Sequence, residues 1–267
     1  MNLQAFQRAL METGSYTTPD DVLASGDIGT SIGYHLAQMR VFYACNRVAK
    51  RGDWCRPVWV YLSYRAWRCV ERAGVRCSIE GFDSFARAGG PCVIVANHMS
   101  MLETIMIPVM VLTCTDLCIV MKESLLHYPV TGVVMKAIEP ITVGRENPRD
   151  DLKAVLEGGQ RVLESGKSLL IFPQSTRDTC FRRSLFNSMG AKLAARSGVP
   201  LIPLALKTDF HGVGRVLRDF GPLDYAKPVH YAFGQAMQVQ GNGKAEHQAC
   251  MDFIAGRLEA WGGETEA

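Results

Sequence analysis

Two side chains between residues 93 and 104 have the types and the spacing that acid–base catalysis needs. A short β-branched run over 93–95 leads into Asn97-His98, and the carboxylic acid Glu103 follows five residues after the histidine. A histidine held by a carboxylate can take a proton from a substrate hydroxyl, and the carboxylate then stabilises the imidazolium that forms. This stretch therefore predicts a general base, His98, with Glu103 as its partner.

The same residues also fit a structural role. Ser100 and Glu103 form the Ser-x-x-Glu pattern of a capping box before an apolar run, in which the carboxylate binds only backbone N–H groups. Positions five apart on a regular helix point about 140° away from each other. Glu103 can therefore reach the ring of His98 only if the histidine stands on a turn before the helix. Spacing alone leaves both interpretations open.

No serine or cysteine stands in an obvious nucleophile elbow between a strand and a helix. A base without a protein nucleophile favours direct attack by an acceptor hydroxyl on an activated acyl donor.

An arginine at the end of a strand is the second candidate. Gly144-Arg145 follows Ile141-Thr142-Val143, the end of an expected strand. The guanidinium group offers a planar fork of donors, which suits an anion such as phosphate. An ordinary surface ion pair with Glu146 or Asp150 is the alternative.

A third candidate follows the next apolar run, over 169–172, which opens into a proline turn and a polar segment, Gln174-Ser175-Thr176-Arg177. Ser175 and Thr176 can donate hydrogen bonds to a phosphate, and Arg177 can bind it. Asp178 offers a structural alternative, because it can neutralise Arg177 directly.

Two prolines three residues apart form the fourth candidate. Pro200 and Pro203 bracket the start of an apolar run over 201–206. They predict a rigid apolar wall, and plain core packing is an almost equally good interpretation.

These residues need a scaffold that brings distant segments together, and from about residue 75 the chain alternates between strand and helix patterns. Strands are expected at 92–96, 117–121, 138–143, 169–172, 201–206 and 229–233, and helices at 101–112, 129–136, 150–165, 187–196 and 244–261. The alternation predicts an α/β fold with a mixed, largely parallel sheet flanked by helices. Catalytic groups should then lie at strand ends and in the loops that follow them.

A helical hairpin is expected before this sheet. Residues 1–31 are polar and turn-rich and predict a loosely packed lead-in, 32–50 show helical spacing, and Pro57 begins a second helix that Gly74 ends. The chain is thus divided into 1–74, a lead-in with a membrane-associating hairpin, and 75–267, the catalytic domain.

The hairpin region is rich in arginine and aromatic residues. Residues 40–76 contain nine Lys or Arg residues but only two acidic residues, Asp53 and Glu71, and three tryptophans lie among them. Such a surface suits an anionic membrane. The alternative is a hairpin packed in the core with a solvated basic end.

The overall composition narrows the functional classes. The 267 residues are 48% hydrophobic and 21% charged, which suffices for a core, and the net charge of +3 does not indicate nucleic-acid binding. Nine cysteines without a C-x-x-C pair predict free thiols rather than a metal site. We find no signal peptide and no apolar run of 18 residues, so a spanning helix is not expected.

Taken in order, the four stretches resemble the motifs of the glycerolipid acyltransferase family, of the 1-acyl-sn-glycerol-3-phosphate acyltransferase type. That family carries Asn-His-x-x-x-x-Asp, a strand ending in Gly-Arg, Phe-Pro-Glu-Gly-Thr-Arg and Val-Pro-x-x-Pro. The resemblance covers roughly residues 75–235, and the order of four motifs is far more specific than any one of them.

The resemblance implies an enzyme of phospholipid biosynthesis that moves an acyl chain from acyl-CoA or acyl carrier protein to the free hydroxyl of a lysophospholipid such as lysophosphatidic acid. It implies no metal and no cofactor beyond this co-substrate, no nucleic-acid partner, and a peripheral or monotopic place on the cytoplasmic side of a membrane. His98 and Glu103 are the implied catalytic pair. The implied substrate-binding residues are Asn97, Arg145, Gln174, Ser175, Thr176, Arg177 and Pro200.

Three positions depart from the family pattern. Glu103 replaces an aspartate, Gln174 replaces a glutamate beside Arg177, and Ser175 replaces a glycine where backbone should approach the acceptor. These changes leave two alternatives open: acyl transfer to a non-glycerol lipid acceptor, and a catalytically inactive relative that only binds lipids.

Overall fold

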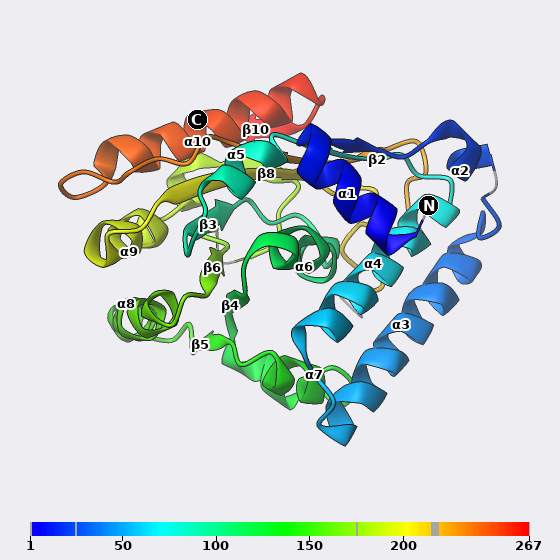
Figure 1. Cartoon of the computed structure of the whole chain (residues 1–267), viewed down its shortest axis with the longest axis horizontal. Coiled ribbons are helices and arrows are strands. Elements are labelled where there is room, and N and C mark those ends of the chain that lie inside the picture. Colours follow the sequence, from blue (N-terminus) through cyan, green and yellow to red (C-terminus); the bar gives the residue numbers. More distant parts are fainter. Residues whose placement is uncertain (1, 25, 175, 215–218, 267) are drawn as a thin grey trace.

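The computed structural model describes residues 2–24, 26–174, 176–214 and 219–266. In these residues, eight strands form one sheet that lies between two layers of helices (Figure 1). The sheet has the order β1-β2-β9-β8-β3-β6-β4-β5, with β1 (Tyr16–Thr17), β2 (Cys77–Glu80), β3 (Val93–Ala96), β4 (Leu117–Lys122), β5 (Ile141–Val143), β6 (Ser168–Ile171), β8 (Leu201–Lys207) and β9 (Val229–Phe233).

Five neighbouring strands, β8, β3, β6, β4 and β5, run parallel to one another. β9 lies antiparallel to β8, and β1 lies antiparallel to β2. The predicted α/β fold with a mixed, largely parallel sheet is confirmed. All six strands expected from the sequence are present, with boundaries that differ by up to three residues.

The strands are apolar throughout because helices cover both faces of the sheet. In β3, Val93 and Val95 belong to the core that the sheet shares with α8 (Pro148–Glu164), α9 (Met189–Ser197) and α10 (Lys244–Ala260). Ile94 and Ala96 point the other way, as the two-residue period of a strand requires. They belong to the core shared with α1 (Leu3–Thr13), α4 (Arg56–Arg72) and α6 (Leu102–Cys114).

The predicted helical hairpin is present as α3 (Ser31–Arg51) and α4. Thr30 caps α3, and Gly52 ends it in the left-handed conformation at φ 74°. α4 packs against α6, which contains Pro108. The hydroxyl of Ser63 donates to the carbonyl of Ile105 at 2.7 Å and accepts from the N–H of Val109 at 2.9 Å. A side chain from α4 thus satisfies backbone groups at the point where the proline interrupts α6.

The expectation that residues 1–31 form a loosely packed lead-in is wrong. Phe6 and Leu10 of α1 are fully buried, and the ring of Phe6 lies 5.4 Å from that of Trp67 on α4. β1 then joins the edge of the main sheet beside β2. The helix is amphipathic, with Phe6 and Leu10 on its buried face, but it has only 11 residues. Packing against α4, rather than intrinsic propensity, accounts for its place in the fold.

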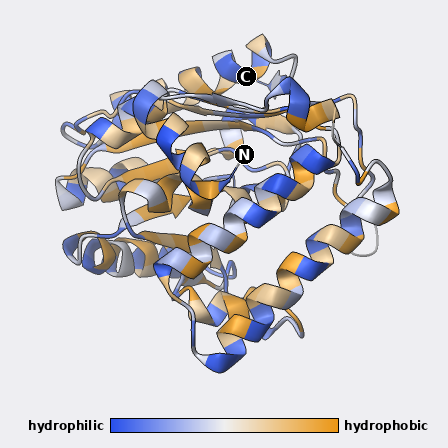
Figure 2. Cartoon of the chain, turned by 45° about the vertical axis from the view of Figure 1, so that its right-hand side comes forward, coloured by the Kyte–Doolittle hydropathy of each residue, from blue (hydrophilic) through white to orange (hydrophobic). Residues whose placement is uncertain are grey.

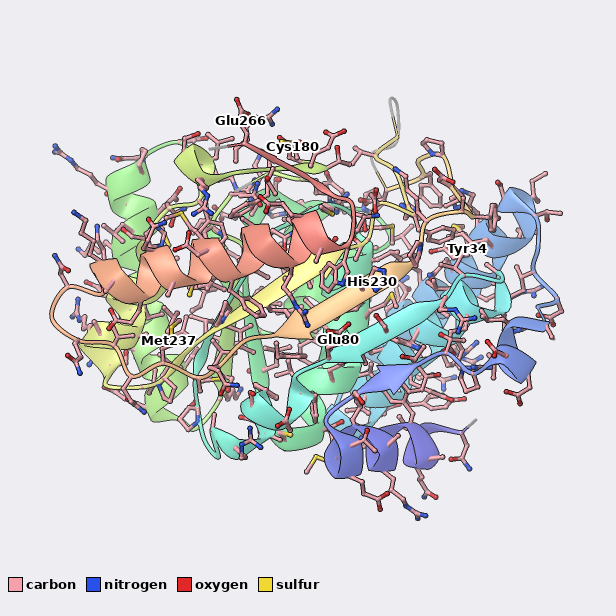
Figure 3. All side chains as sticks on the ribbon, turned by 90° about the horizontal axis from the view of Figure 1, so that it is seen from above. Tyr34, Glu80, Cys180, His230, Met237 and Glu266 are labelled. Carbon is pink, nitrogen blue, oxygen red and sulfur yellow. The ribbon has the colours of Figure 1, made fainter. Side chains whose placement is uncertain are left out.

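Several short elements were not expected. They are β2, α5 (Phe82–Arg87), the 3₁₀ turns Glu123–His127 and Arg183–Leu185, β7 (Cys180–Arg182) and β10 (Glu264–Glu266). α2 (Asp20–Ala24) begins where Thr18-Pro19-Asp20-Asp21 has the pattern of a helix start. β10 pairs with β7 in a second, parallel sheet, at the edge where Figure 3 labels Cys180 and Glu266. The helix expected at 129–136 begins only at Gly132, as α7 (Gly132–Ala137).

No described helix has both the length and the apolar character needed to cross a bilayer. The division of the chain at residue 74 stays a prediction.

Candidate active site

The polar residues selected from the sequence gather at one edge of the sheet. His98 follows β3, Arg177 follows β6 and Arg145 follows β5, and these strands are parallel members of one sheet. The carboxyl ends of parallel strands share an edge, which is where α/β folds place their sites. All three side chains line the same pocket.

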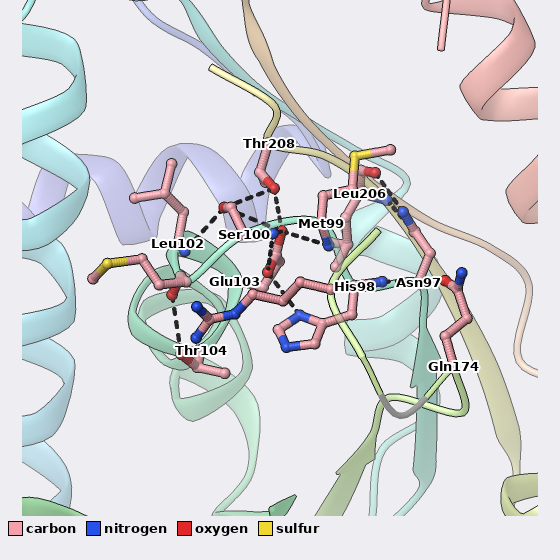
Figure 4. Close-up of polar contacts among 12 residues, drawn as sticks. Asn97, His98, Met99, Ser100, Leu102, Glu103, Thr104, Gln174, Leu206 and Thr208 are labelled. Atoms are coloured by element: carbon pink, nitrogen blue, oxygen red, sulfur yellow. Dashed lines mark hydrogen bonds and ion pairs between the residues drawn. The ribbon is translucent and has the colours of Figure 1, made fainter. Parts of the chain in front are cut away.

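His98 and Glu103 are in direct contact (Figure 4). Nδ1 of the imidazole lies 2.9 Å from Oε2 of the carboxylate. An ionised carboxylate only accepts hydrogen bonds, so Nδ1 is the donor, which leaves Nε2 without a proton in the neutral ring. His98 stands on the turn between β3 and α6, as the contact requires.

The other oxygen of Glu103 closes the start of α6. Oε1 accepts the backbone N–H of Ser100 at 2.8 Å and that of Met99 at 3.3 Å, and it accepts the hydroxyl of Thr208 (Figure 4). The two interpretations of the sequence are therefore both realised, because the carboxylate has two oxygens. One caps the helix, and the other holds the ring of His98.

Glu103 is fully buried yet ionised. Burial by itself raises the pKa of this carboxyl. The hydrogen bond and charge of His98, together with hydrogen bonds from Thr208 and the Ser100 backbone, outweigh burial and lower the pKa below its ordinary value. The partner of the imidazole is thus a carboxylate.

The other contacts of His98 fix the orientation of its ring. The ring stacks on Phe172 with centroids 4.3 Å apart. The backbone N–H of His98 donates to Oε1 of Gln174 at 3.3 Å, and its carbonyl accepts the N–H of Asp178 at 2.9 Å. Nε2 has no hydrogen-bond partner within the described residues, and His98 lines the pocket. A substrate hydroxyl in the pocket can therefore reach this nitrogen.

Two predicted substrate-binding residues support the loop instead of lining the pocket. Both amide atoms of Asn97 pair with the backbone of Leu206, at 2.7 and 2.8 Å, and so tie β3 to β8. Gln174 is buried, and its oxygen holds the backbone of His98. A glutamate at this position would offer the same acceptor, so this departure from the family pattern keeps the contact.

Arg145 is displayed on a strained turn. Its φ is 65°, a left-handed conformation that costs a non-glycine residue about 1–2 kcal/mol. The carboxylate of Asp151 accepts the backbone N–H groups of Gly144 and Arg145, at 3.0 and 3.1 Å. These bonds hold the turn. The guanidinium group of Arg145 itself forms no ion pair within the described residues.

The remaining predictions have mixed outcomes. Arg177 lines the pocket and pairs with Asp219. Thr176 is exposed and does not line it, and Ser175 lies outside the described residues. Pro200 is at the opposite edge of the sheet, because it precedes β8 and its carbonyl accepts the N–H of Val93. The structure therefore does not bring Pro200 together with His98.

The pocket is lined by both charged and apolar side chains. Its volume is about 1240 Å³ with the open mouth included. Three cationic side chains, Lys122, Arg145 and Arg177, line it with His98. The remaining wall is largely apolar and includes Ile105, Leu125, Met135, Ile138, Val143 and Phe172. A second apolar pocket between α3, α4, α6 and α7 shares Ile105, Met135 and Ile138 and extends to Trp54 and Trp59.

Two contributors were missed from the sequence. Lys122 ends β4 and lines the pocket, and Thr208 follows β8 and donates to Glu103. Lys122 directly follows the strand expected at 117–121, and Thr208 comes two residues after the strand expected at 201–206. The rule that selected Arg145 therefore points to both positions, although it does not predict the contact with Glu103. The pattern Gly29-x-Ser31-x-Gly33 matches the consensus of a nucleophile elbow, but Ser31 is the exposed first residue of α3 and follows α2 rather than a strand. It is not a nucleophile elbow.

Comparison with known proteins gives three findings. A family model described as Acyltransferase matches residues 77–207. The 1-acyl-sn-glycerol-3-phosphate acyltransferase of Pseudomonas aeruginosa is 28% identical over 244 residues, which cover 91% of this chain and 86% of that protein. A chloroplastic enzyme of the same name from Brassica napus is 28% identical over 53% of this chain and 39% of its own length.

The fold is also similar to a solved structure. The crystal structure of the 1-acyl-sn-glycerophosphate acyltransferase from Thermotoga maritima matches with a TM-score of 0.62 and 16% identity, over 86% of this chain and 93% of that one. This likeness shows the fold, and the sequence matches confirm the resemblance that the order of the four motifs predicts.

Proposed function

The chain belongs to the acyltransferase family, and from this premise we propose that it transfers a fatty acyl group from an acyl thioester to the free hydroxyl of lysophosphatidic acid. One observation carries the proposal. A buried carboxylate holds Nδ1 of His98, and His98 lines a pocket that also has cationic groups and an apolar wall. A lysolipid with a phosphate head and an acyl tail has the same two-part character.

In the proposed reaction, Nε2 of His98 takes the proton of the acceptor hydroxyl. The oxygen attacks the carbonyl carbon of the thioester, so that a C–O bond forms and the C–S bond breaks. The proton then passes from His98 to the thiolate that leaves. Glu103 stabilises the imidazolium between these two steps. No covalent acyl-enzyme is needed, and among the described residues no hydroxyl or thiol is hydrogen-bonded to the ring of His98.

The cationic side chains of the pocket suit a phosphate monoester. Lys122, Arg145 and Arg177 would neutralise its charge, and the arginines can each offer two parallel donors. The apolar wall would hold an acyl chain. The neighbouring apolar pocket, which shares Ile105 with this wall and is lined by Trp54 and Trp59, would give that chain room to extend.

We further propose that α3 docks the enzyme on the cytoplasmic face of an anionic membrane. Its exposed surface carries an apolar stripe at helical spacing: Ile32, Leu36, Met39 and Tyr43. Figure 2 shows hydrophobic and hydrophilic residues interspersed along this helix. Arg40, Arg47 and Lys50 are exposed on the same helix and would face the lipid phosphates.

Sedimentation with vesicles that contain anionic phospholipid tests the docking surface. Leu36→Asp should reduce the bound fraction severalfold. Met11→Asp changes an equally exposed methionine on α1 and should leave it unchanged. Equal binding of wild type and Leu36→Asp would exclude α3 as the docking surface.

The proposed reaction is tested by thiol release from acyl-CoA and from acyl carrier protein, each with a series of acceptors. We expect release that depends on lysophosphatidic acid, with the diacyl product found by mass spectrometry. Release only with a non-glycerol acceptor would move the proposal to that lipid. Binding of lysolipid without release from either donor would identify a lipid-binding relative.

A further inference from the structure

The two arginines of the pocket differ in their partners. Nη1 of Arg177 donates to Oδ1 of Asp219 at 2.5 Å, and both side chains line the pocket with His98. Arg145 has no side-chain ion pair within the described residues. One of the two proposed phosphate-binding groups is therefore occupied by an internal carboxylate, and the other is open.

Asp219 is held by this contact and by no other interaction that the described part of the chain provides. Asp151, the other acid of the pocket, accepts two backbone N–H groups and is part of the turn that carries Arg145. The side chain of Asp219 is 38% exposed, whereas that of Arg177 is 20% exposed. The carboxylate can therefore turn to solvent while the guanidinium group stays in the pocket wall.

We propose that Asp219 occupies the place of the acceptor's phosphate on Arg177 and so determines which head groups the enzyme accepts. This inference rests on the proposed function. An acceptor must displace the carboxylate before it can bind Arg177. Asp219 is then a specificity-determining residue, and it takes no part in proton transfer.

The charge of the competing groups sets the selectivity. A phosphate monoester carries between one and two negative charges at neutral pH and presents three terminal oxygens. The phosphodiester of a lysophosphatidylcholine carries one charge and has a cationic neighbour, so it gains little by replacing a carboxylate. Because Arg177 is mostly buried, its interactions are screened by salt less than those of surface groups. Displacement therefore favours the monoester.

Equilibrium binding in the absence of any acyl donor tests the inference. The two probes are a short-chain lysophosphatidic acid and the lysophosphatidylcholine of the same chain, both below their micelle concentrations. Titration calorimetry gives a Kd for each. Asp219→Asn keeps the size of the side chain and removes its charge. Asp252→Asn is the matched control, because Asp252 pairs with Arg183 at the same 2.5 Å and neither residue lines the pocket.

We expect Asp219→Asn to lower the Kd of lysophosphatidic acid by about threefold to tenfold. It should lower the Kd of lysophosphatidylcholine by a smaller factor, because this head group gains less from Arg177 once the carboxylate is removed. Asp252→Asn should change neither value. A higher or unchanged Kd for lysophosphatidic acid in Asp219→Asn would overturn the inference, because Asp219 would then only hold Arg177 in position.

A kinetic measurement separates this inference from the proposed function. If the wild type transfers acyl groups, Asp219→Asn should lower KM for lysophosphatidic acid and leave kcat within about twofold, since uniform binding changes KM alone. A fall in kcat with KM unchanged would contradict the inference. If no acceptor is acylated, the proposed function fails, and the calorimetric comparison still decides whether Asp219 competes with phosphate.

Discussion

Glu103 holds Nδ1 of His98 at 2.9 Å with one oxygen while the other closes the first turn of α6. The helix start and the proposed base are thus set by the same side chain. Correct capping of α6 and correct orientation of the imidazole therefore depend on the same side chain. The hydrogen bonds that reach this carboxylate, from His98, Met99, Ser100 and Thr208, explain how it stays ionised in full burial.

Glu103→Gln should lower kcat by about 10²–10⁴-fold. The amide keeps the volume of the side chain and an oxygen for the cap, but it cannot stabilise an imidazolium by charge. KM for the acceptor should change little, because Glu103 does not line the pocket. Steady-state thiol release measures both parameters. An unchanged kcat in a folded variant would reduce Glu103 to a helix cap.

Thr208→Val should destabilise the protein by about 1–3 kcal/mol at pH 7, because it removes a donor from a buried carboxylate. The pKa of Glu103 is lower in the folded protein than in the unfolded chain. Its contribution to stability is therefore present above the unfolded pKa and is lost as the pH falls through the folded pKa. The difference between wild type and variant should shrink below about pH 4.5.

Urea unfolding at a series of pH values measures this difference. Thr179→Val, at an exposed position, is the control and should shift the free energy of unfolding by less than about 0.5 kcal/mol. A loss in Thr208→Val that is equal at all pH values would show that the effect comes from packing and not from the carboxylate.

Arg145→Ala should raise KM for lysophosphatidic acid about tenfold or more, as expected for the loss of charge-assisted hydrogen bonds to phosphate. kcat should stay nearly constant, because the contact is made equally in the ground state and the transition state. Arg149→Ala, on the exposed start of α8 and outside the pocket, is the control. Equal KM values for the two variants would remove Arg145 from the phosphate site.

Phe6→Ala should cost about 3–5 kcal/mol in the free energy of unfolding, because the ring is fully buried among Tyr16, Tyr64 and Trp67. Met11→Ala changes an exposed residue of the same helix and should cost less than about 0.5 kcal/mol. Chemical denaturation compares the two. A cost below 1 kcal/mol for Phe6→Ala would show that α1 is loosely packed and contributes little to stability.

The central strands were predictable from the sequence because each is buried on both faces and reads as a short apolar run. The positions of His98, Arg145 and Arg177 followed from the rule that sites form past the carboxyl ends of parallel strands. The same rule argues against Pro200, which precedes its strand and so lies at the other edge of the sheet. It was given a site role from the family resemblance, and its place relative to the strand was not used.

Other features depend on contacts that no local pattern encodes. The hydroxyl of Thr208 reaches Glu103 from 105 positions away in the chain, and Asp219 reaches Arg177 from 42 positions away. α1 was missed because a helix of 11 residues is stabilised mainly by what it packs against. The left-handed turn at Arg145 depends on Asp151, and its sequence alone does not require it.

Acceptor-dependent thiol release by wild type and His98 variants tests the central claim most directly. With saturating acyl donor and lysophosphatidic acid, we expect wild-type turnover and a fall of at least about 10²-fold in His98→Ala. His98→Gln keeps a donor for the buried carboxylate of Glu103 and should fall equally, with a circular dichroism spectrum like that of the wild type. Turnover retained in these folded variants would contradict His98 as the general base.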